Sequence, residues 1–277
     1  MSVRQQAGKS FDHFVRVVGT RLDGSPLAVM LDIDGTLAPI APRPEDAIVP
    51  AATRDTLRQL IALPGTTVAL VSGRSAEDAW RVAGLAGAWV VGNHGLELRD
   101  PDGRVTTPQE VLPYEKVIAE AVRSLRSIER TVAGAIVENK RWGLSIHYRQ
   151  VEPDASPALI ERSREVAREL GLRATEGKKI IEVRPPVDIN KGTATTALAE
   201  RVGALRDGAS VMYAGDDRTD EDAFRALRTR DPRAVTARID TSEADPSDTA
   251  TNAEFVFGSP DELRLVLEWL VARRGRA

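Results

Sequence analysis

The sequence predicts an α/β protein with a doubly wound, mostly parallel sheet and a smaller α+β domain inserted into it. Apolar runs of strand length alternate with stretches of helical spacing before residue 103 and again after residue 187. Between these stretches the alternation stops, and acidic or hydroxyl side chains stand where several of the apolar runs end. We therefore expect a core from 1–103 and 188–277 and an inserted domain over 104–187.

The most informative stretch is the apolar run 27–31 with the two carboxylates that follow it. Five apolar residues in a row are typical of a strand buried on both faces of a parallel sheet. Asp32 and Asp34 follow at its carboxyl end, where open α/β sheets bind ligands. Two carboxylates this close repel each other unless a cation or a shared proton relieves them. The pair indicates catalysis or metal binding, and a polar strand end with an Asx turn is the alternative.

Two further strands of the first stretch end in polar turns. The strand 66–71 follows a helix over 51–63 and ends at Ser72, just before another helix. A hydroxyl beside free helix amides suits an oxyanion, although an ordinary strand-to-helix turn would look the same. The strand 88–91 ends in the glycine-rich turn 92–95, whose histidine is consistent with a ligand contact or with a structural role.

The middle of the chain predicts a helix followed by two strands, twice over. Such a unit is typical of a small antiparallel sheet with helices on one face. In chain order the expected elements are a helix over 113–130, strands over 135–137 and 144–148, a helix over 157–170, and strands over 172–175 and 179–183.

The alternating pattern then returns. The expected elements are a helix over 193–202, a strand over 211–214, a helix over 220–227, strands over 234–239 and 255–257, and a helix over 261–273, with an acidic mobile loop over 240–251. Lys191 precedes the first of these helices, and Asp216, Asp217 and Asp220 follow the first strand. An acidic loop with a helix cap is the alternative reading of these three acids.

Composition narrows the function further. A net charge of −3 with interspersed signs argues against a nucleic-acid partner, and the absence of cysteine excludes thiolate metal sites. Three histidines leave few imidazole ligands, so an oxygen-bound Mg²⁺ is the first candidate for a metal. Residues 1–22 contain neither a signal peptide nor a membrane span, so we expect a cytoplasmic protein without a membrane partner.

The strand-end residues together predict phosphoryl chemistry. The acids would hold a cation, while Ser72 and Lys191 would face a phosphoryl group whose charge the cation and the ammonium neutralise. A P-loop and a kinase signature are both missing from the sequence.

At these positions the sequence resembles the haloacid-dehalogenase superfamily of phosphatases, and within it the trehalose-6-phosphate phosphatases. The four superfamily motifs correspond to Asp32-Ile33-Asp34-Gly35-Thr36, Ser72, Lys191 and Gly215-Asp216-Asp217. The narrower resemblance rests on Ser72-Gly73-Arg74, Gly92-Asn93-His94-Gly95, Val137-Glu138-Asn139-Lys140, His147-Tyr148-Arg149, Gly177-Lys178, Glu182, Asn190-Lys191-Gly192 and the acidic motif through Glu221. One departure is Ile189, where many relatives carry an aromatic residue.

The resemblance implies a haloacid-dehalogenase-like Rossmannoid core with an inserted cap. In this family Asp32 is the nucleophile that forms an aspartyl-phosphate, and Asp34 is the general acid and base. Mg²⁺ would be held by Asp32, the main-chain carbonyl of Asp34 and Asp216, with support from Asp217 and Asp220. Ser72 and Lys191 would bind the phosphate.

The resemblance also implies a small-molecule substrate, trehalose 6-phosphate, and a functional link to trehalose-phosphate synthase. The substrate-binding residues would be Arg74, Asn93 and His94 in the core and Glu138, Lys140, Arg149, Lys178 and Glu182 in the insert. Taken singly, the insert residues are as consistent with solvated charges on exposed strands. The alternatives are a phosphatase for another glycosyl phosphate, such as glucosyl- or mannosyl-phosphoglycerate or sucrose phosphate, and an inactive regulatory partner of the synthase.

Overall fold

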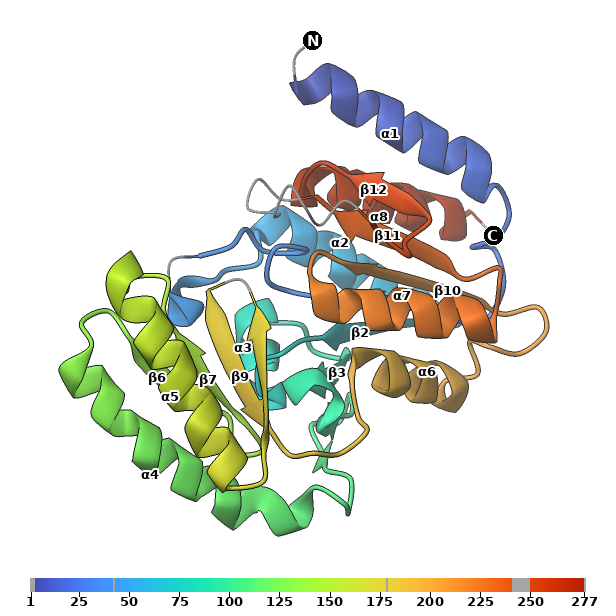
Figure 1. The fold of residues 1–277 in the computed structure, drawn as a ribbon. Coiled ribbons are helices and arrows are strands. Elements are labelled where there is room, and N and C mark those ends of the chain that lie inside the picture. Colours follow the sequence, from blue (N-terminus) through green and yellow to red (C-terminus); the bar gives the residue numbers. More distant parts are fainter. Residues whose placement is uncertain (1–2, 42, 178, 241–249, 277) are drawn as a thin grey trace. The chain divides into compact units, whose positions relative to one another are not determined.

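The computed structural model describes residues 3–41, 43–177, 179–240 and 250–276. The chain divides into two compact units. Unit 1 consists of Met1–Val105 and Ile189–Ala277, and unit 2 consists of Thr106–Asp188. Unit 2 therefore interrupts unit 1 in the sequence, and it is the green to yellow part of the ribbon in Figure 1.

Unit 1 is built on a sheet with strand order β12-β11-β10-β1-β2-β3-β4-β5. All pairings from β12 to β3 are parallel, and β3 pairs with β4 antiparallel. Leu31 lies opposite Ala214 on one side and Leu70 on the other, so the residues after these three strands meet at one edge of the sheet. The strands are β1 (Leu27–Leu31), β2 (Thr66–Val71), β3 (Trp89–Gly92), β4 (Glu97–Arg99), β5 (Val105–Thr106), β10 (Ser210–Gly215), β11 (Val235–Ile239) and β12 (Phe255–Phe257).

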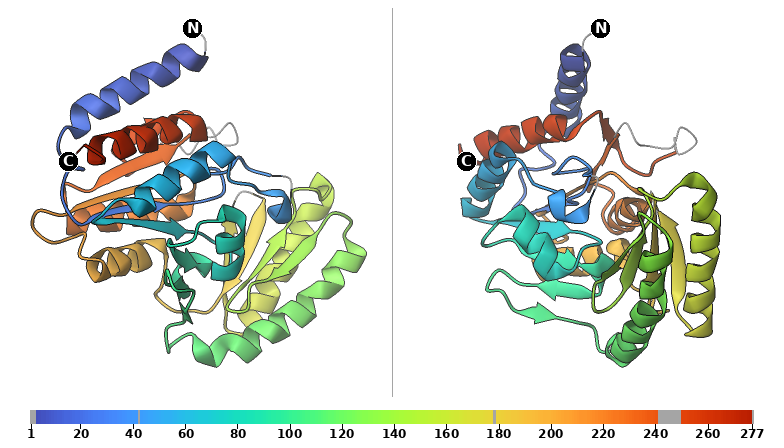
Figure 2. Two further views of the ribbon diagram at one scale, coloured as in Figure 1. Left: turned by 180° about the vertical axis from the view of Figure 1, so that it is seen from behind. Right: turned by 90° about the vertical axis from the view of Figure 1, so that its left-hand side faces the viewer.

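Helices cover both faces of this sheet, because its central strands are buried throughout and have two apolar faces to shield. One core cluster joins the sheet to α1 (Val3–Val18), α2 (Ala51–Ala62), α3 (Ala76–Ala83) and α8 (Pro260–Arg274). A second cluster joins the opposite face to α6 (Lys191–Arg201) and α7 (Arg218–Arg230). Figure 1 shows α6 and α7 in front of the sheet, and the rear view in Figure 2 shows α2 and α8. The predicted doubly wound sheet is confirmed.

Three elements of unit 1 were not expected from the sequence. Helix α1 packs the apolar residues of its second half against the core cluster. Phe14 is fully buried, with its ring centroid 4.9 Å from that of Phe255 and 5.5 Å from that of Phe257. Strands β4 and β5 are too short to show a periodicity. Helix α6 begins at Lys191, two residues earlier than expected, because Asn190 and Thr193 form a capping box.

Unit 2 has a four-stranded antiparallel sheet in the order β6-β7-β9-β8. Its elements in chain order are α4 (Glu115–Thr131), β6 (Ile136–Asn139), β7 (Leu144–His147), α5 (Ser156–Glu169), β8 (Arg173–Gly177) and β9 (Ile180–Arg184). The repeated helix-strand-strand pattern is as predicted. Val137, Ile146 and Ile181 belong to the core cluster that includes the buried faces of α4 and α5. Since side chains alternate along a strand, Glu138, Ser145 and Glu182 lie on the other face.

The remaining regular elements are short 3-10 helices. They are η1 (Pro44–Asp46), η2 (Asn93–Gly95), η3 (Leu112–Tyr114) and η4 (Pro153–Ala155). Within the described part of the chain, no helix combines the length and the apolar composition needed to cross a membrane.

Candidate active site

The loop after β1 brings two acidic segments into contact. Asp32 extends the sheet ladder, since its amide donates to the carbonyl of Ala214 at 2.9 Å, and the residue is 4% exposed. Gly35 has a φ of +88°, and a Cβ at this position would lie 2.3 Å from Oδ2 of Asp216. A residue with a side chain would therefore be strained and would collide with that carboxylate. Glycine at this turn lets the loop of Asp32 approach Asp216.

Lys191, at the first position of α6, connects the acids. Its Nζ donates to Oδ1 of Asp32 at 2.9 Å and to Oδ1 of Asp220 at 2.8 Å. Lys191 is 2% exposed. The hydroxyl of Tyr213 on β10 donates to the same oxygen of Asp220 at 2.5 Å. The other oxygen of Asp220 accepts the amides of Asp216 and Asp217, both at 3.0 Å, so Asp220 shapes the loop after β10.

Burial controls the electrostatics of this cluster. It raises the pKa of Asp32 well above its usual value, against the opposing effect of Lys191, and the charge of Asp220 adds to the rise. Burial likewise raises the pKa of Asp220 to about 6, again against Lys191. Burial alone would lower the pKa of Lys191, but the charges of Asp220 and Asp32 outweigh it and raise that pKa. The ammonium of Lys191 is therefore always charged, whereas burial and the neighbouring acids disfavour the ionised forms of Asp32 and Asp220.

The same acids have the chemistry of a divalent-cation site. One oxygen each from Asp32, Asp216 and Asp220 lies within 4.8 Å of the others, and such hard oxygen donors fit Mg²⁺. Asp220 already accepts hydrogen bonds at both oxygens, so it fits a supporting position. Asp217 caps α7 by accepting the amide of Thr219 at 2.8 Å, and this also fits support better than ligation. Asp32 and Asp216 are the side chains best placed to hold a cation.

Ser72 directly follows β2, in a turn that is hydrogen-bonded to the turn after β3. Its residue is 1% exposed, and its Oγ accepts the amide of Arg74 at 3.2 Å. The amide of His94 donates to the carbonyl of Ser72 at 3.0 Å, and the amide of Asn93 donates to the carbonyl of Arg74 at 2.7 Å. Asn93 and His94 have φ values of 50° and 54°, a conformation that non-glycine residues rarely adopt. The two turns thus form one rigid edge next to the amino end of α3.

The side chain of Arg74 is engaged within the protein. Its Nε and Nη2 donate to the two oxygens of Asp34, both at 2.7 Å, and its Nη1 donates to Asp78 at 2.7 Å. Burial would lower the pKa of Arg74, but these two acids raise it. A planar two-pronged pair fixes the orientation of a carboxylate as well as its position. Arg74 therefore orients Asp34, and its expected contact with the substrate stays a prediction.

Three of the insert residues expected to bind sugar, Glu138, Lys140 and Glu182, lie together on the polar side of the sheet in unit 2. Nζ of Lys140 lies 3.8 Å from Glu138 and 3.6 Å from Glu182. His147, which was not among the expected site residues, places Nε2 2.8 Å from a carboxylate oxygen of Glu138. Arg149 is exposed in the turn after β7. A face with two carboxylates, an ammonium and an imidazole matches a ligand rich in hydroxyl groups.

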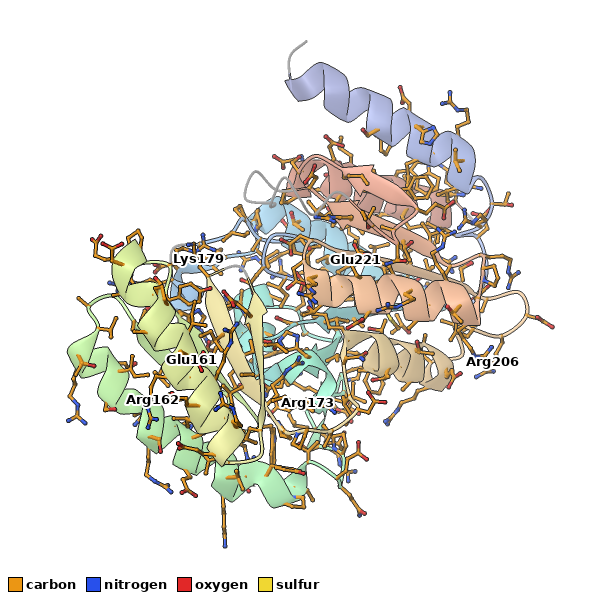
Figure 3. The ribbon with its side chains drawn as sticks, in the orientation of Figure 1. Glu161, Arg162, Arg173, Lys179, Arg206 and Glu221 are labelled. Atoms are coloured by element: carbon orange, nitrogen blue, oxygen red, sulfur yellow. The ribbon has the colours of Figure 1, made fainter. Side chains whose placement is uncertain are left out.

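Lys178, also expected to bind sugar, lies outside the described residues. Its neighbour Lys179, labelled in Figure 3, lies in the turn between β8 and β9, with Nζ 5.9 Å from the ring centroid of Tyr148. Glu221, labelled in the same figure, lies in the first turn of α7 next to Asp220 and accepts the amide of Asn252 at 2.7 Å. Glu221 thereby holds the segment that leads into β12.

The sequence offered no signal for Tyr213, which reads as one more apolar residue of a buried strand. His147 carried a partial signal, because it stands in one of the motifs that support the resemblance. Tyr213 and His147 each contact a partner on a neighbouring element, Asp220 on α7 and Glu138 on β6, and the sequence pattern does not record these contacts.

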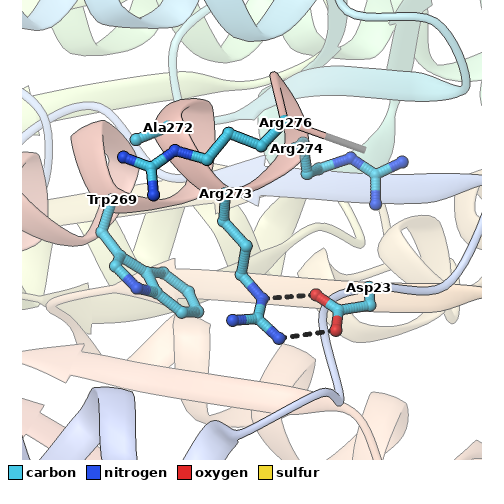
Figure 4. Close-up of a pocket in the computed structure, with 6 residues that line it drawn as sticks. All are labelled: Asp23, Trp269, Ala272, Arg273, Arg274 and Arg276. Atoms are coloured by element: carbon cyan, nitrogen blue, oxygen red, sulfur yellow. Dashed lines mark hydrogen bonds and ion pairs between the residues drawn. The ribbon is translucent and has the colours of Figure 1, made fainter.

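A separate hollow of about 490 Å³ lies near the end of α8 (Figure 4). Asp23 lines it and precedes β1, so the hollow lies toward the sheet edge opposite Asp32. Arg273 donates two hydrogen bonds to Asp23, and Arg274 donates to the carbonyls of Leu22 and Gly24. These contacts fasten α8 to the sheet, and the hollow does not belong to the acidic site.

Known proteins resemble this chain over most of its length. A family model described as trehalose-phosphatase matches residues 30–260. The chain belongs to the trehalose-phosphatase family. It is 35% identical over 240 residues to a trehalose-phosphate phosphatase of Mycolicibacterium paratuberculosis, a match that covers 86% of this chain and 60% of that protein. It is also 40% identical over 210 residues to an uncharacterized glycosyl hydrolase of Mycobacterium tuberculosis, covering 75% of this chain and 16% of that protein.

The chain thus spans less than two thirds of the length of these two relatives. Among solved structures, a trehalose-6-phosphate phosphatase related protein matches with a TM-score of 0.77 and 26% identity, covering 90% of this chain and 99% of that one. The haloacid-dehalogenase-like core with an inserted α+β unit, expected from the resemblance, is confirmed.

Proposed function

We propose that the protein is a Mg²⁺-dependent phosphatase that hydrolyses trehalose 6-phosphate to trehalose and phosphate. The observation that carries the proposal is the buried contact of Lys191 with Asp32, beside Asp216 and Asp220. A nucleophilic carboxylate, a fixed cationic group and a set of cation-binding oxygens at one strand end are the parts that phosphoryl transfer to an aspartate requires. Membership of the trehalose-phosphatase family supports the choice of substrate.

In the proposed reaction, an oxygen of Asp32 attacks phosphorus while the bond from phosphorus to the sugar oxygen breaks. Asp34 donates a proton to the departing sugar oxygen, so trehalose leaves as an alcohol and Asp32 carries the phosphoryl group. A water then attacks phosphorus and gives a proton to Asp34, while the bond from phosphorus to the oxygen of Asp32 breaks, so that inorganic phosphate leaves and Asp32 is again a free carboxylate. Lys191 orients Asp32 through its 2.9 Å hydrogen bond and neutralises charge beside the phosphoryl oxygens, which Ser72 would also contact.

Asp32, Asp216 and the main-chain carbonyl of Asp34 would hold the metal, supported by Asp217 and Asp220. Bound Mg²⁺ would neutralise negative charge on the phosphoryl oxygens and on the carboxylates. Asn93 and His94 in the core and Glu138, Lys140, Arg149, Lys178 and Glu182 in unit 2 would bind the sugar. A synthase that makes trehalose 6-phosphate would be the functional partner, because it supplies the substrate.

Phosphate release from a panel of trehalose 6-phosphate, sucrose 6-phosphate, glucose 6-phosphate and an aryl phosphate tests the substrate. Within this panel, Glu182→Ala is expected to lower kcat/KM on trehalose 6-phosphate, and the fall should correspond to a loss of roughly 2–4 kcal/mol of transition-state stabilisation. The fall in kcat/KM on the aryl phosphate should be much smaller. The loss should include kcat, because contacts to the sugar position the phosphoryl group as well as bind it.

The matched control is Glu176→Ala. Glu176 lies on β8 of the same sheet, where it accepts the Tyr148 hydroxyl at 2.9 Å and pairs with Arg164 at 2.8 Å. By strand alternation it points to the opposite face from Glu182. It should change the melting temperature without changing the preference among substrates. If Glu182→Ala lowered kcat/KM equally on both substrates, unit 2 would serve stability alone. A wild-type enzyme with no preference for trehalose 6-phosphate would overturn the assignment of that substrate.

Added Mg²⁺ is expected to raise the melting temperature, and to do so more at pH 8 than at pH 5.5. Because the pKa values of Asp32 and Asp220 are raised, proton binding favours the metal-free fold at low pH. The pKa of Asp220 is about 6, so its part of this stabilisation is lost as the pH rises through about 6. A cation competes with these protons, so its apparent affinity grows over the same range. At saturation the shift at pH 8 should be about 3 °C or more.

Asp216→Asn should remove most of this shift, whereas Asp55→Asn should keep it, because the Asp55 side chain is 65% exposed on α2. Differential scanning fluorimetry with Mg²⁺ and with Ca²⁺ measures the effect. A shift that is the same at both pH values, or that survives in Asp216→Asn, would place the cation elsewhere.

A further inference from the structure

Ser145 occupies the centre of a polar row that crosses the sheet of unit 2. It lies directly opposite Glu138 of β6 on one side and opposite Glu182 of β9 on the other. Residues opposite each other in antiparallel strands point to the same face of the sheet. The row therefore runs across the face that turns away from the apolar cluster shared with α4 and α5.

The hydroxyl of Ser145 is buried and lacks a hydrogen-bond partner. The residue is 1% exposed, and its Oγ neither donates to nor accepts from another group of the described chain. The neighbouring carboxylates are directed elsewhere: Glu138 is 2.8 Å from Nε2 of His147, and both acids pair with Lys140. A buried hydroxyl in this condition costs free energy unless another molecule satisfies it.

We infer that Ser145 is a further specificity-determining residue, whose hydroxyl binds a hydroxyl group of the sugar. The inference rests on the proposed function and adds a residue to it. A serine hydroxyl can donate one hydrogen bond and accept others, and a sugar hydroxyl can do the same. In a bond between the two, either hydroxyl can be the donor and the other the acceptor. Glu138 and Glu182 accept only, and Lys140 donates only, so Ser145 supplies the row with a group that does both.

The structure also supplies a matched control in the same unit. Ser163 on α5 is fully buried like Ser145, but its Oγ donates to the carbonyl of Leu159 at 2.8 Å. Ser163→Ala removes a satisfied hydrogen bond, whereas Ser145→Ala removes an unsatisfied hydroxyl. The first should lower the melting temperature, and the second should leave it unchanged or raise it.

The experiment measures the melting temperature and kcat/KM on trehalose 6-phosphate and on an aryl phosphate for the wild type, Ser145→Ala and Ser163→Ala. In Ser145→Ala the ratio of kcat/KM for trehalose 6-phosphate to that for the aryl phosphate should fall about 10-fold, while Ser163→Ala keeps the wild-type ratio. The Kd of trehalose 6-phosphate, measured by calorimetry on Asp32→Asn and on Asp32→Asn combined with Ser145→Ala, should rise by a similar factor.

An unchanged ratio and Kd in the Ser145 variants would overturn the inference and would mean that water satisfies the hydroxyl. A lower melting temperature with equal losses on both substrates would also overturn it, because Ser145 would then be structural. The proposed function is judged separately, by the wild-type activity on the panel of sugar phosphates.

Discussion

Replacing Asp32 by asparagine is expected to lower kcat by about 10⁴-fold or more while the protein stays folded. An amide is a poor nucleophile, so the aspartyl-phosphate cannot form, and the amide is also a weaker ligand for Mg²⁺. The melting temperature should be unchanged or higher. Burial and the charge of Asp220 raise the pKa of Asp32, which means that its ionised form is disfavoured in the fold. An uncharged asparagine avoids both the cost of burying a charge and the repulsion from Asp220.

Acid quenching of a reaction with labelled substrate provides the direct measurement. The wild type should carry phosphate bound to the protein and released by hydroxylamine, and Asp32→Asn should carry none. The matched control is Asp55→Asn, whose side chain is 65% exposed on α2 and which should react like the wild type. More than about one hundredth of the wild-type kcat in Asp32→Asn, with a melting temperature that shows a folded protein, would remove Asp32 from the nucleophilic role.

Replacing Asp34 by asparagine is expected to slow trehalose 6-phosphate far more than an aryl phosphate, by about 100-fold or more in the ratio of their kcat/KM values. A sugar oxygen is a poor leaving group that needs a proton, whereas an aryl oxide leaves without one. Hydrolysis of the aspartyl-phosphate would be slow with either substrate, because Asp34 would no longer take the proton of the attacking water. The aryl phosphate should therefore give a rapid burst of aryl oxide, and phosphoenzyme should accumulate.

Asp78→Asn is the matched control for this variant. Asp78 shares the guanidinium of Arg74 with Asp34, so its replacement perturbs the same arginine and leaves both hydrogen bonds from Arg74 to Asp34 in place. Its losses should be small and similar for both substrates. If Asp34→Asn lost both activities equally, or showed no burst, Asp34 would be acting through structure or through the metal.

The fold was predictable where the sequence pattern is strong. Strands 27–31 and 66–71 are long apolar runs with sharp boundaries, and β1 and β2 have those bounds. Prediction failed where the stabilising contact is distant. Helix α1 is held by Phe14 against Phe255 and Phe257, which lie about 240 residues away along the chain. The helical spacing of its apolar residues is present in the sequence, but that spacing does not say which distant residues they contact.

The candidate site divides in the same way. Asp32, Ser72 and Asp216 could be expected at one edge because each follows a strand of one parallel sheet, and the carboxyl ends of parallel strands lie together whatever the side chains do. The roles of these residues stay predictions until the variants are measured.

The sequence by itself determined most of the longer elements, their order and the edge of the sheet at which the acids would meet, because periodicity and turn chemistry act over a few neighbouring residues. Only the tertiary structure decided the partners. Arg74 turns to Asp34 and Asp78, and Lys191 joins Asp32 to Asp220 across 159 and 29 positions of the sequence. A hydrogen bond forms only within about 3 Å and in the right direction. That condition depends on how distant elements pack, and a linear pattern of residues does not contain it.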